Sequence, residues 1–158
     1  MGWGYLPFAS AQTLTAMANF MNNYPQTVLT DSVYFHHMER YVESQHHRGR
    51  PYIGEYLDEV TGYWLKGDQE RSRYYNHSTF NDLMITGLIG LRPRMDNTVE
   101  VNPLIPEGKW DYFCLDNVLY HAVTSLFCGI RTQPLPAWKR SAYLCGWKGS
   151  GTRRYIDP

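Results

Sequence analysis

The sequence has few cysteines and no excess of charge of either sign. Its 158 residues include three cysteines, Cys114, Cys128 and Cys145, at wide and irregular spacing. Because no Cys-x-x-Cys pair occurs, we expect no zinc site of that type, and the odd count provides no disulfide framework. The formal net charge is zero, so the whole-chain composition indicates neither a nucleic acid nor an anionic membrane as the partner.

Long apolar runs are also lacking. The longest, Leu83 to Leu91, is far shorter than the ~20 residues that cross a bilayer. The opening residues, MGWGYLPFAS, have neither the basic start nor the apolar core of a secretion signal, so we expect none in this chain. The compartment is left open. No glycine-rich phosphate loop occurs in the sequence.

Aromatic residues are abundant instead. The sequence has 13 tyrosines and five tryptophans. Both side chains combine an apolar face with a polar group, which suits carbohydrate surfaces and ordinary cores alike. The chain is long enough for one domain with its own core.

Apolar spacing predicts two helices in the first 50 residues. Ser10 is expected to cap a helix through AQTLTAMANFMNNY, which ends at Tyr24-Pro25. Thr30 or Asp31 begins a second helix, DSVYFHHMERYVESQ, which HHRGRP breaks. Its broad apolar face is expected from Val33, Phe35, Met38 and Val42, with Tyr34 and Tyr41.

A third helix and several strands are expected further along. Ser78 caps TFNDLMITGLIGL, with Asp82 in the first turns and a stop at Arg92-Pro93. TVEVNPL then alternates like a strand, and KWDYFCLDNVLYHAV predicts one or two more, with Asp116-Asn117 between them. Three helices with broad apolar faces make a poor core alone, so they indicate a slice of a larger helical assembly.

Glu55 is the leading candidate for chemistry. It lies in a loop from Pro51 to Asn76 whose residues are aromatic and charged, which favours a packed functional loop over a linker. Inverting glycosidases need one carboxyl group as general acid and a second as general base. Glu55 can be that base or, alternatively, a solvated or salt-bridged loop residue. The aromatic residues nearest it are Tyr52, Tyr56, Tyr63 and Trp64.

Other polar residues of the loop have two interpretations each. Unless the loop turns sharply, Asp58 and Glu59 lie too close in sequence to Glu55 to form a pair across a sugar ring, and turn formation at D-E-V-T-G is favoured for both. Asn76 and His77 precede the third helix, where His77 can hydrogen-bond a sugar hydroxyl or the catalytic carboxylate, or simply fix the loop.

Histidine pairs and an aromatic opening complete the candidates. The adjacent histidines at 36–37 and 46–47 point about 100° apart on a helix, so we expect no metal site there. Trp3, Tyr5 and Phe8 form the opening, which lines a sugar subsite or covers a helix end. Gln12 is the polar residue in the first turn of the helix that follows.

Four blocks of sequence carry a family resemblance. They are PFASAQTLTAMANFMNNYP (7–25), GEYLDEVTGYW (54–64), YYNHSTFNDLMITGLIGLRPR (74–94) and VEVNPL (99–104). Through them, residues 5–121 resemble the C-terminal part of the catalytic domain of six-hairpin, (α/α)6-barrel glycoside hydrolases. The nearest groups are the mannosylglycerate-hydrolase-like and family-63-like enzymes, and trehalase is a more distant relative.

The resemblance implies a fold class. It implies a mainly α fold, with part of an (α/α)6 toroid over residues 1–94 that contains about three helices. The start of a β-rich region is implied over 95–123, and 124–158 is an irregular tail. A shifted reading frame from Gly129 is a hypothesis for that tail, which the coding DNA tests.

The resemblance also implies roles for single residues. The family loop reads approximately E-N-Y-N-P-E-T-G, and its first Glu, the general base, matches Glu55, with Thr61-Gly62 closing the spacing. Tyr56-Leu57 stands where the family has Asn-Tyr. No metal or cofactor is implied. The implied substrate-binding residues are Tyr5, Gln12, Tyr56, Trp64, Asn76 and His77.

Two departures from the family shape the expected function. The family's general acid, an Asp, lies on an earlier hairpin that this chain lacks, and Leu6 stands where the opening motif has Trp. We therefore expect a fragment of an inverting glycoside hydrolase, inactive alone, whose partners are a carbohydrate and the missing N-terminal part of its own barrel. The alternative is a small carbohydrate-binding or interaction module without catalysis. A nucleic-acid binder with a basic tail after residue 130 ranks below both.

Overall fold

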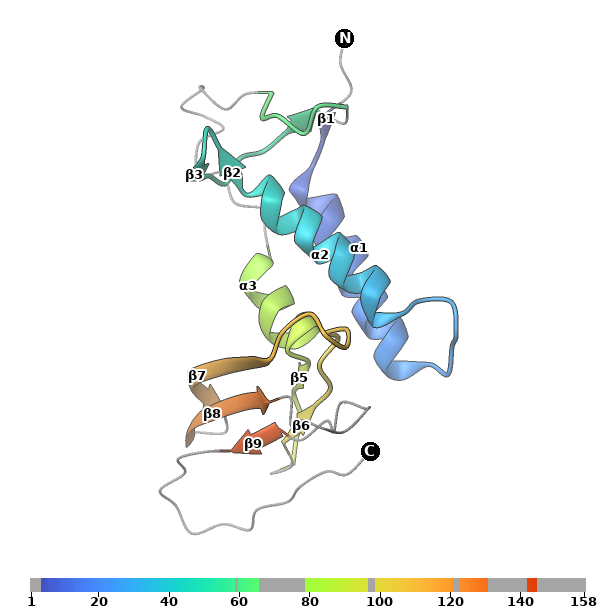
Figure 1. The fold of residues 1–158 in the computed structure, drawn as a ribbon, viewed down its shortest axis with the longest axis vertical. Helices are drawn as coiled ribbons and strands as arrows, with labels where there is room; N and C mark the ends of the chain where they lie inside the picture. Colours follow the sequence, from blue (N-terminus) through green and yellow to red (C-terminus); the bar gives the residue numbers. More distant parts are fainter. Residues whose placement is uncertain are drawn as a thin grey trace. The chain divides into compact units, whose positions relative to one another are not determined.

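The computed structural model describes residues 4–58, 60–65, 79–96, 99–120, 123–130 and 142–144, of which residues 4, 5, 123–130 and 142–144 are described by backbone alone. The chain divides into two compact units, Met1–Leu83 and Met84–Pro158. The two long helices lie in the first unit, and the longest strands lie in the second (Figure 1). This order confirms the predicted fold class, while the domain boundaries predicted at residues 94 and 123 stay a prediction.

Helix α1 (Pro7–Asn23) begins earlier than the sequence predicts. Pro7 occupies the first helical turn, where its missing N–H costs nothing and its fixed φ suits the helix. Ser10 therefore lies inside α1, and the prediction that it caps the helix is wrong. The predicted end is confirmed, because Tyr24 is the C-cap and its N–H donates to the carbonyl of Phe20 at 3.2 Å.

Helix α2 (Asp31–Ser44) begins where its cap is predicted. The Oγ1 of Thr30 accepts a hydrogen bond from the Val33 N–H at 3.3 Å, which satisfies a backbone donor of the first turn. Asp31 places a negative charge at the same end, where the helix dipole favours it.

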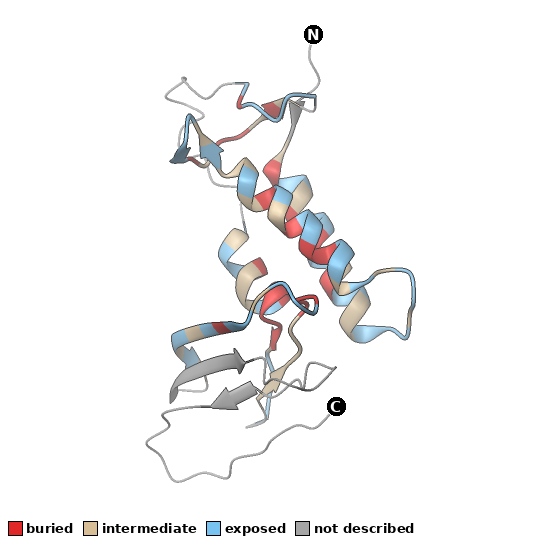
Figure 2. Ribbon diagram, viewed as in Figure 1, coloured by how far each residue is buried: buried red, intermediate tan, exposed pale blue. Residues whose placement is uncertain are grey.

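The two helices run side by side and form the main core of the first unit (Figure 1). Buried positions recur along both of them (Figure 2). In α1 they are Pro7, Ala11, Leu14 and Ala18, and in α2 they are Tyr34, Phe35, Met38 and Tyr41. Val33, predicted for the buried face, is exposed, because the stripe at Tyr34, Met38 and Tyr41 faces the core instead.

Two short antiparallel pairs flank this core. Strands β2 (His46–His47) and β3 (Arg50–Pro51) pair with each other. Their turn, Arg48-Gly49, has φ values of 51° and 72°, the left-handed pair that a two-residue hairpin needs. HHRGRP therefore does more than end α2: it turns the chain back on itself. Strands β1 (Gly4–Tyr5) and β4 (Leu57–Asp58) form the second pair.

The third predicted helix is not one continuous α-helix. A single turn, α3 (Phe80–Asp82), continues as the π-helical segment η1 (Leu83–Leu88). The Ile89 N–H donates to the carbonyl of Met84, five residues back, at 3.0 Å. Ser78, the predicted cap, lies outside the described residues.

Among the described residues, no helix is long and apolar enough to span a bilayer.

Strands dominate the second unit. They are β5 (Leu91–Arg92), β6 (Glu100–Val101), β7 (Tyr112–Tyr120), β8 (Val123–Ile130) and β9 (Ala142–Leu144). Strands β5 and β6 pair, and β7, β8 and β9 form an antiparallel sheet in that order. Asp116-Asn117 does not separate two strands: the register shifts there inside β7, and Asn117 has a φ of 59°.

The sheet continues beyond residue 123, where the sequence predicts an irregular tail. The backbone of β8 pairs with β7 on one side and with β9 on the other. Residues 131–141 and 145–158, which hold the basic tail and most of the stretch covered by the reading-frame hypothesis, lie outside the described residues.

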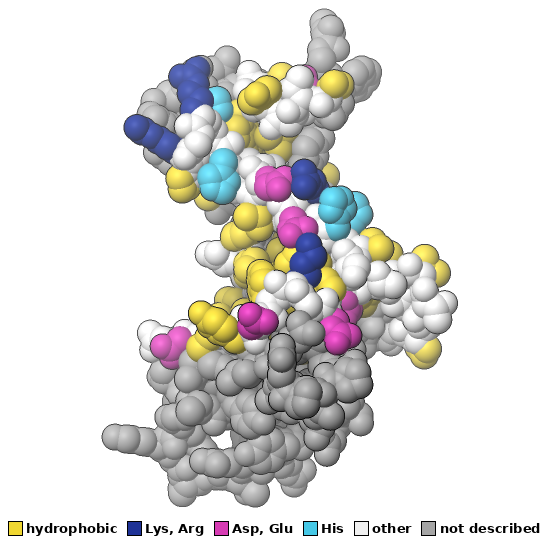
Figure 3. Space-filling view, viewed as in Figure 1, with side chains coloured by type: hydrophobic (Ala, Val, Ile, Leu, Met, Phe, Trp, Pro, Cys, Tyr) yellow, Lys and Arg dark blue, Asp and Glu magenta, His cyan; other side chains and the backbone are white. Residues whose placement is uncertain are grey.

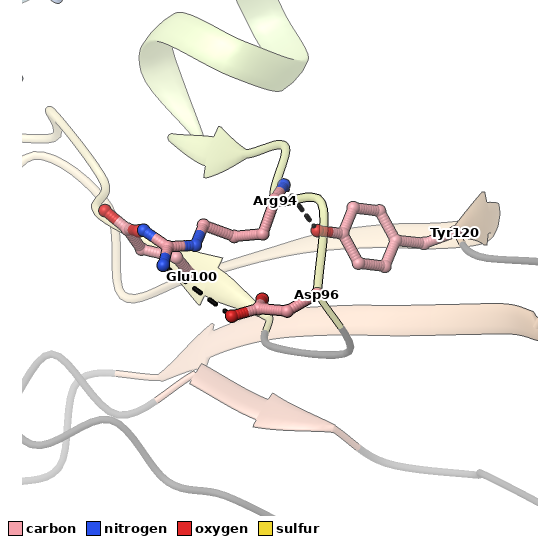
Figure 4. Close-up of polar contacts among 4 residues, drawn as sticks. All are labelled: Arg94, Asp96, Glu100 and Tyr120. Carbon is pink, nitrogen blue, oxygen red and sulfur yellow. Dashed lines mark hydrogen bonds and ion pairs between the residues drawn. The ribbon is translucent and has the colours of Figure 1, made fainter.

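Arg94 joins the β5–β6 connection to the end of β7 (Figure 4). Its backbone N–H donates to the Tyr120 hydroxyl at 3.0 Å. Its guanidinium lies 3.3 Å from a Glu100 oxygen and 3.7 Å from an Asp96 oxygen. All three charged groups are exposed, so these ion pairs orient the connection more than they stabilise it.

Removing the Tyr34 hydroxyl is expected to stabilise the first unit. Tyr34 is fully buried, its hydroxyl has no hydrogen-bond partner in the described part of the chain, and burial raises the pKa of Tyr34 to about 12. Tyr34→Phe removes a buried polar group and keeps the ring, so we expect a gain of about 1 kcal/mol in the free energy of unfolding. Urea unfolding measures it, with the exposed Tyr24→Phe as control. A loss of stability would show that the Tyr34 hydroxyl makes a stabilising hydrogen bond, which contradicts this account.

Replacing Gly90 is expected to destabilise the second unit. Gly90 has a φ of +75°, and a Cβ there would lie 1.9 Å from the Asn102 carbonyl oxygen, while the Asn102 N–H donates to the Gly90 carbonyl at 2.9 Å. Gly90→Ala therefore meets both backbone strain and a clash, and we expect a loss of roughly 2–4 kcal/mol. Gly49→Ala is the matched control, because Gly49 has a φ of +72° and open space around it. Equal losses in urea unfolding of the two variants would contradict the close contact.

Candidate functional site

Glu55 lies between β3 and β4, and it is buried. Only 8% of the residue is exposed. Glutamate is almost never fully buried unless it is paired. The burial argues against the solvated alternative for Glu55, while the salt-bridged alternative is not tested.

The residue before Glu55 is packed against two aromatic rings. A Cβ on Gly54 would lie 2.6 Å from a ring carbon of Tyr52 and 2.6 Å from one of Trp64. The Tyr52 N–H donates to the carbonyl of Gln45 at 2.9 Å, which fixes Tyr52 to the end of α2. Only glycine allows the backbone to pass this close to both rings.

The residues after Glu55 begin a short hairpin. Leu57 pairs with Trp64 across it and with Tyr5 of β1 on its other side. The Leu65 N–H donates to the Tyr56 carbonyl at 3.1 Å. The backbone is therefore held on both sides of Glu55.

Trp64 connects the residues before Glu55 to the residues after it. Its ring lies 5.1 Å from that of Tyr52 at an interplanar angle of 63°, an edge-to-face contact. Its indole N–H donates to the His46 carbonyl at 2.8 Å. Only 7% of Trp64 is exposed, and it forms a buried cluster with Tyr52 and Leu57.

Asp58 organises the turn of the hairpin. Its Oδ1 accepts hydrogen bonds from the Thr61 N–H at 2.7 Å, the Thr61 hydroxyl at 2.9 Å and the Val60 N–H at 3.0 Å. These bonds, the one from the Thr61 N–H above all, lower the pKa of Asp58. Gly62 closes the turn with a φ of +67°. Asp58 thus has the turn-forming role that the sequence favours, and Glu59 lies outside the described residues.

The predicted binding residues are brought together in part. Pairing of β1 with β4 places the Tyr5 backbone beside Leu57, two residues after Glu55. Tyr56 is half-buried in the hairpin, and Gln12 is exposed on α1. Asn76 and His77 lie outside the described residues. The assignment of these residues to a substrate stays a prediction.

Tyr63 is a candidate that the family resemblance does not assign to the site. It is 73% exposed, at the end of the hairpin that follows Glu55. Its neighbours Val60 and Leu65 are exposed as well. An exposed aromatic ring beside a turn offers an apolar face to a sugar. The signal is present in T-G-Y-W, where two aromatic residues directly follow the turn glycine.

The first unit also contains an open cavity of about 580 Å³. Its lining combines aromatic rings with amide, imidazole and carboxylate groups. The lining residues are Val42, Gln45, His46, Pro51, Tyr52, Ile53, Thr79, Phe80, Asn81 and Asp82. Glu55 does not line it, so the cavity and the candidate base are adjacent in sequence at Tyr52–Ile53 but are separate features.

Charged and histidine side chains do not form a metal centre in the part of the chain that the structure describes. No group of three or more His, Cys, Asp or Glu residues there is arranged to hold an ion. Basic side chains gather over the β2–β3 hairpin (Figure 3), where Arg48 and Arg50 are exposed. The rings of His36 and His37 lie 5.9 Å apart on the exposed side of α2. The absence of a metal requirement stays a prediction.

The Asp58 turn is expected to make stability depend on pH. Because the folded-state pKa of Asp58 is lowered, its stabilising contribution is present above the unfolded-state pKa and is lost as the pH falls through the folded-state value. We expect the melting temperature of the native chain to exceed that of Asp58→Asn near neutral pH, with the difference shrinking below pH ~4.

Thermal unfolding followed by circular dichroism between about pH 7 and 2.5 measures this difference. Asp111→Asn controls for the loss of one exposed carboxylate outside the turn. A difference for Asp58→Asn that grows as the pH falls would show that the ionised carboxylate does not stabilise the turn.

Comparisons with known proteins match part of the chain to a glycoside hydrolase family. Residues 6–78 match the family model of the mannosylglycerate hydrolase MGH1-like glycoside hydrolase domain. A solved structure named "Sialidase" is 71% identical to this chain with a TM-score of 0.80, and the match covers 89% of this chain and 13% of that chain. No curated protein matches the sequence. The predicted resemblance to mannosylglycerate-hydrolase-like glycoside hydrolases is thereby confirmed.

Proposed function

We propose that this chain forms part of an (α/α)6-barrel glycoside hydrolase in which Glu55 is the general base of an inverting hydrolysis. One observation carries the proposal. Glu55 is only 8% exposed, directly before an anchored aromatic hairpin, inside the segment that matches a glycoside hydrolase family model. Such a reaction needs one carboxylate as general base, together with a general acid.

In the proposed reaction, Glu55 takes a proton from a water molecule. That water attacks the anomeric carbon from the ring face opposite the leaving group. A general acid, contributed by residues outside this chain, donates a proton to the leaving oxygen. The anchors on both sides of Glu55 support this role, because a base acts well only when it is held near one geometry.

The proposed substrate is a carbohydrate. Tyr5, Gln12, Tyr56, Asn76 and His77 are proposed to contact it, as the family resemblance implies, and the exposed ring of Tyr63 adds a stacking surface. Trp64 is the sixth contact that the resemblance implies, but its burial favours a supporting role for it. Neither a cofactor nor a metal is part of the proposed reaction.

We further propose that the isolated chain is inactive and that other helices of the barrel cover α1 and α2. Large apolar side chains on these helices and their connection are exposed, which supports such a cover. They are Phe8, Phe20, Tyr24, Val28 and Val33. The chain spans 13% of the length of the sialidase-named chain, so the remaining helices and the general acid would come from other parts of a longer protein.

The sugar is left to experiment. The name "Sialidase" applies to that whole chain, of which this chain matches 13%, and the family description names mannosylglycerate. A substrate panel should therefore include an aryl sialoside, mannosylglycerate and an aryl mannoside.

An exchange protein tests the function. In it, the sequence of this chain replaces the matching segment of the sialidase-named chain, which is 71% identical to it and so favours correct folding. We expect the exchange protein to hydrolyse a member of the panel and Glu55→Gln to lower kcat by about 10²–10⁴-fold, because the amide cannot accept the proton.

Two controls make the result clear. Asp111→Asn tests the loss of an exposed carboxylate outside the site, and circular dichroism verifies folding of each variant. A folded exchange protein without hydrolysis, or one whose Glu55→Gln variant retains full kcat, would contradict the proposal. If no protein of the set hydrolyses the substrates, and Glu55→Gln binds sugar as tightly as the unsubstituted exchange protein, the alternative of a carbohydrate-binding module is favoured.

A further inference from the structure

We propose that Tyr52, Gly54 and Trp64, here named the ring clamp, set the position of the Glu55 carboxylate for proton transfer. Gly54 and Trp64 are then positioning residues of the reaction, which act through Glu55 and not on the substrate. This inference rests on the proposed function, since it requires Glu55 to be the base.

The first part of the clamp fixes the backbone directly before Glu55. The Cα of Gly54 approaches both rings so closely that a Cβ would lie 2.6 Å from Tyr52 and 2.6 and 2.8 Å from two carbons of Trp64. Real Cβ atoms do not approach ring carbons to this distance, so a side chain at position 54 must displace either the rings or its own backbone. Glu55 is the next residue and moves with it.

The second part fixes the rings themselves. Trp64 cannot retreat freely, because its indole N–H donates to the His46 carbonyl at 2.8 Å and its backbone pairs with Leu57. The Tyr52 ring cannot retreat freely either, because it lies 5.3 Å from the His47 ring and 5.1 Å from the Trp64 ring, and only 7% of Tyr52 is exposed. A larger side chain at position 54 would therefore displace the backbone of residues 54 and 55.

The clamp also explains why an aromatic residue as buried as Trp64 lies in a sugar-hydrolase loop. A residue that is 7% exposed, with its N–H bonded to a carbonyl and its ring against Tyr52 and Gly54, offers little of its face to a sugar. Tyr63, the preceding residue, is 73% exposed and is free of that constraint. Trp64 thus supports the loop, and its neighbour Tyr63 has a ring that is exposed for stacking.

The consequence for the reaction is a selective loss of kcat. A shift of about 1 Å in a catalytic group lowers the rate by up to ~10²-fold, while substrate contacts elsewhere are kept. In the exchange protein we expect Gly54→Ala to lower kcat by roughly 10–100-fold and to leave KM within about 3-fold. Trp64→Phe keeps a ring against Gly54 but loses the N–H donor, so its kcat should fall less.

Gly49→Ala is the matched control, because it makes the same change in the β2–β3 turn, where a φ of +72° causes strain but nothing lies within 4 Å of the new Cβ. All variants are assayed well below their melting temperatures. This separates misplacement of Glu55 from loss of fold, since a merely unstable variant keeps the kcat of its folded fraction.

Three outcomes decide between the claims. A low kcat with unchanged KM for Gly54→Ala, together with normal kcat for Gly49→Ala, supports the clamp. Equal kcat for the two alanine variants, while Glu55→Gln is inactive, overturns the clamp and leaves the proposed function standing. Full activity of Glu55→Gln overturns the proposed function, and the clamp with it.

Discussion

The contact between Gly54 and the rings of Tyr52 and Trp64 is the constraint on which the candidate site depends. It brings together the end of α2, through Gln45 and His46, and the hairpin after Glu55, through Leu57 and Trp64. The buried cluster of Tyr52, Leu57 and Trp64 joins these segments, and Glu55 is buried in the same part of the chain.

Two turns, one before and one after Glu55, then fix the position of the segment that contains it. Two left-handed residues, Arg48 and Gly49, reverse the chain after α2, and Asp58 with Gly62 reverses it again after Glu55. The segment between these reversals is short, so it has little freedom once both turns have formed. A carboxylate is costly to bury unless it is paired or hydrogen-bonded.

Features that depend on neighbouring residues can be predicted from the sequence. Thr30 at the start of α2, Tyr24-Pro25 at the end of α1 and the turn at Asp58 all follow from side chains within a few residues. The four sequence blocks are sufficient to indicate the glycoside hydrolase relation, which the family model confirms, and to single out Glu55 as the candidate base. The class of protein is thus accessible from the sequence.

Features that depend on distant contacts cannot be predicted in this way. Pairing of Tyr5 with Leu57 joins segments that no local pattern connects, and apolar spacing cannot distinguish the π-helical turn at Leu83–Leu88 from an α-helix. Burial of Trp64 escapes prediction for the same reason, because its contact with the Tyr52 ring is defined only by the fold. The aromatic composition of the loop draws attention to this region, but it does not show which rings are buried and which are exposed.

One measurement tests the assignment of Glu55 most directly: the product formed by the Glu55→Ala exchange protein from an aryl glycoside in the presence of azide. With the base removed, a small anion can attack the anomeric carbon without losing a proton. The account predicts recovery of turnover and a glycosyl azide of inverted anomeric configuration, seen by NMR. Undiminished hydrolysis by water without azide, or a glycosyl azide of retained configuration, would contradict it.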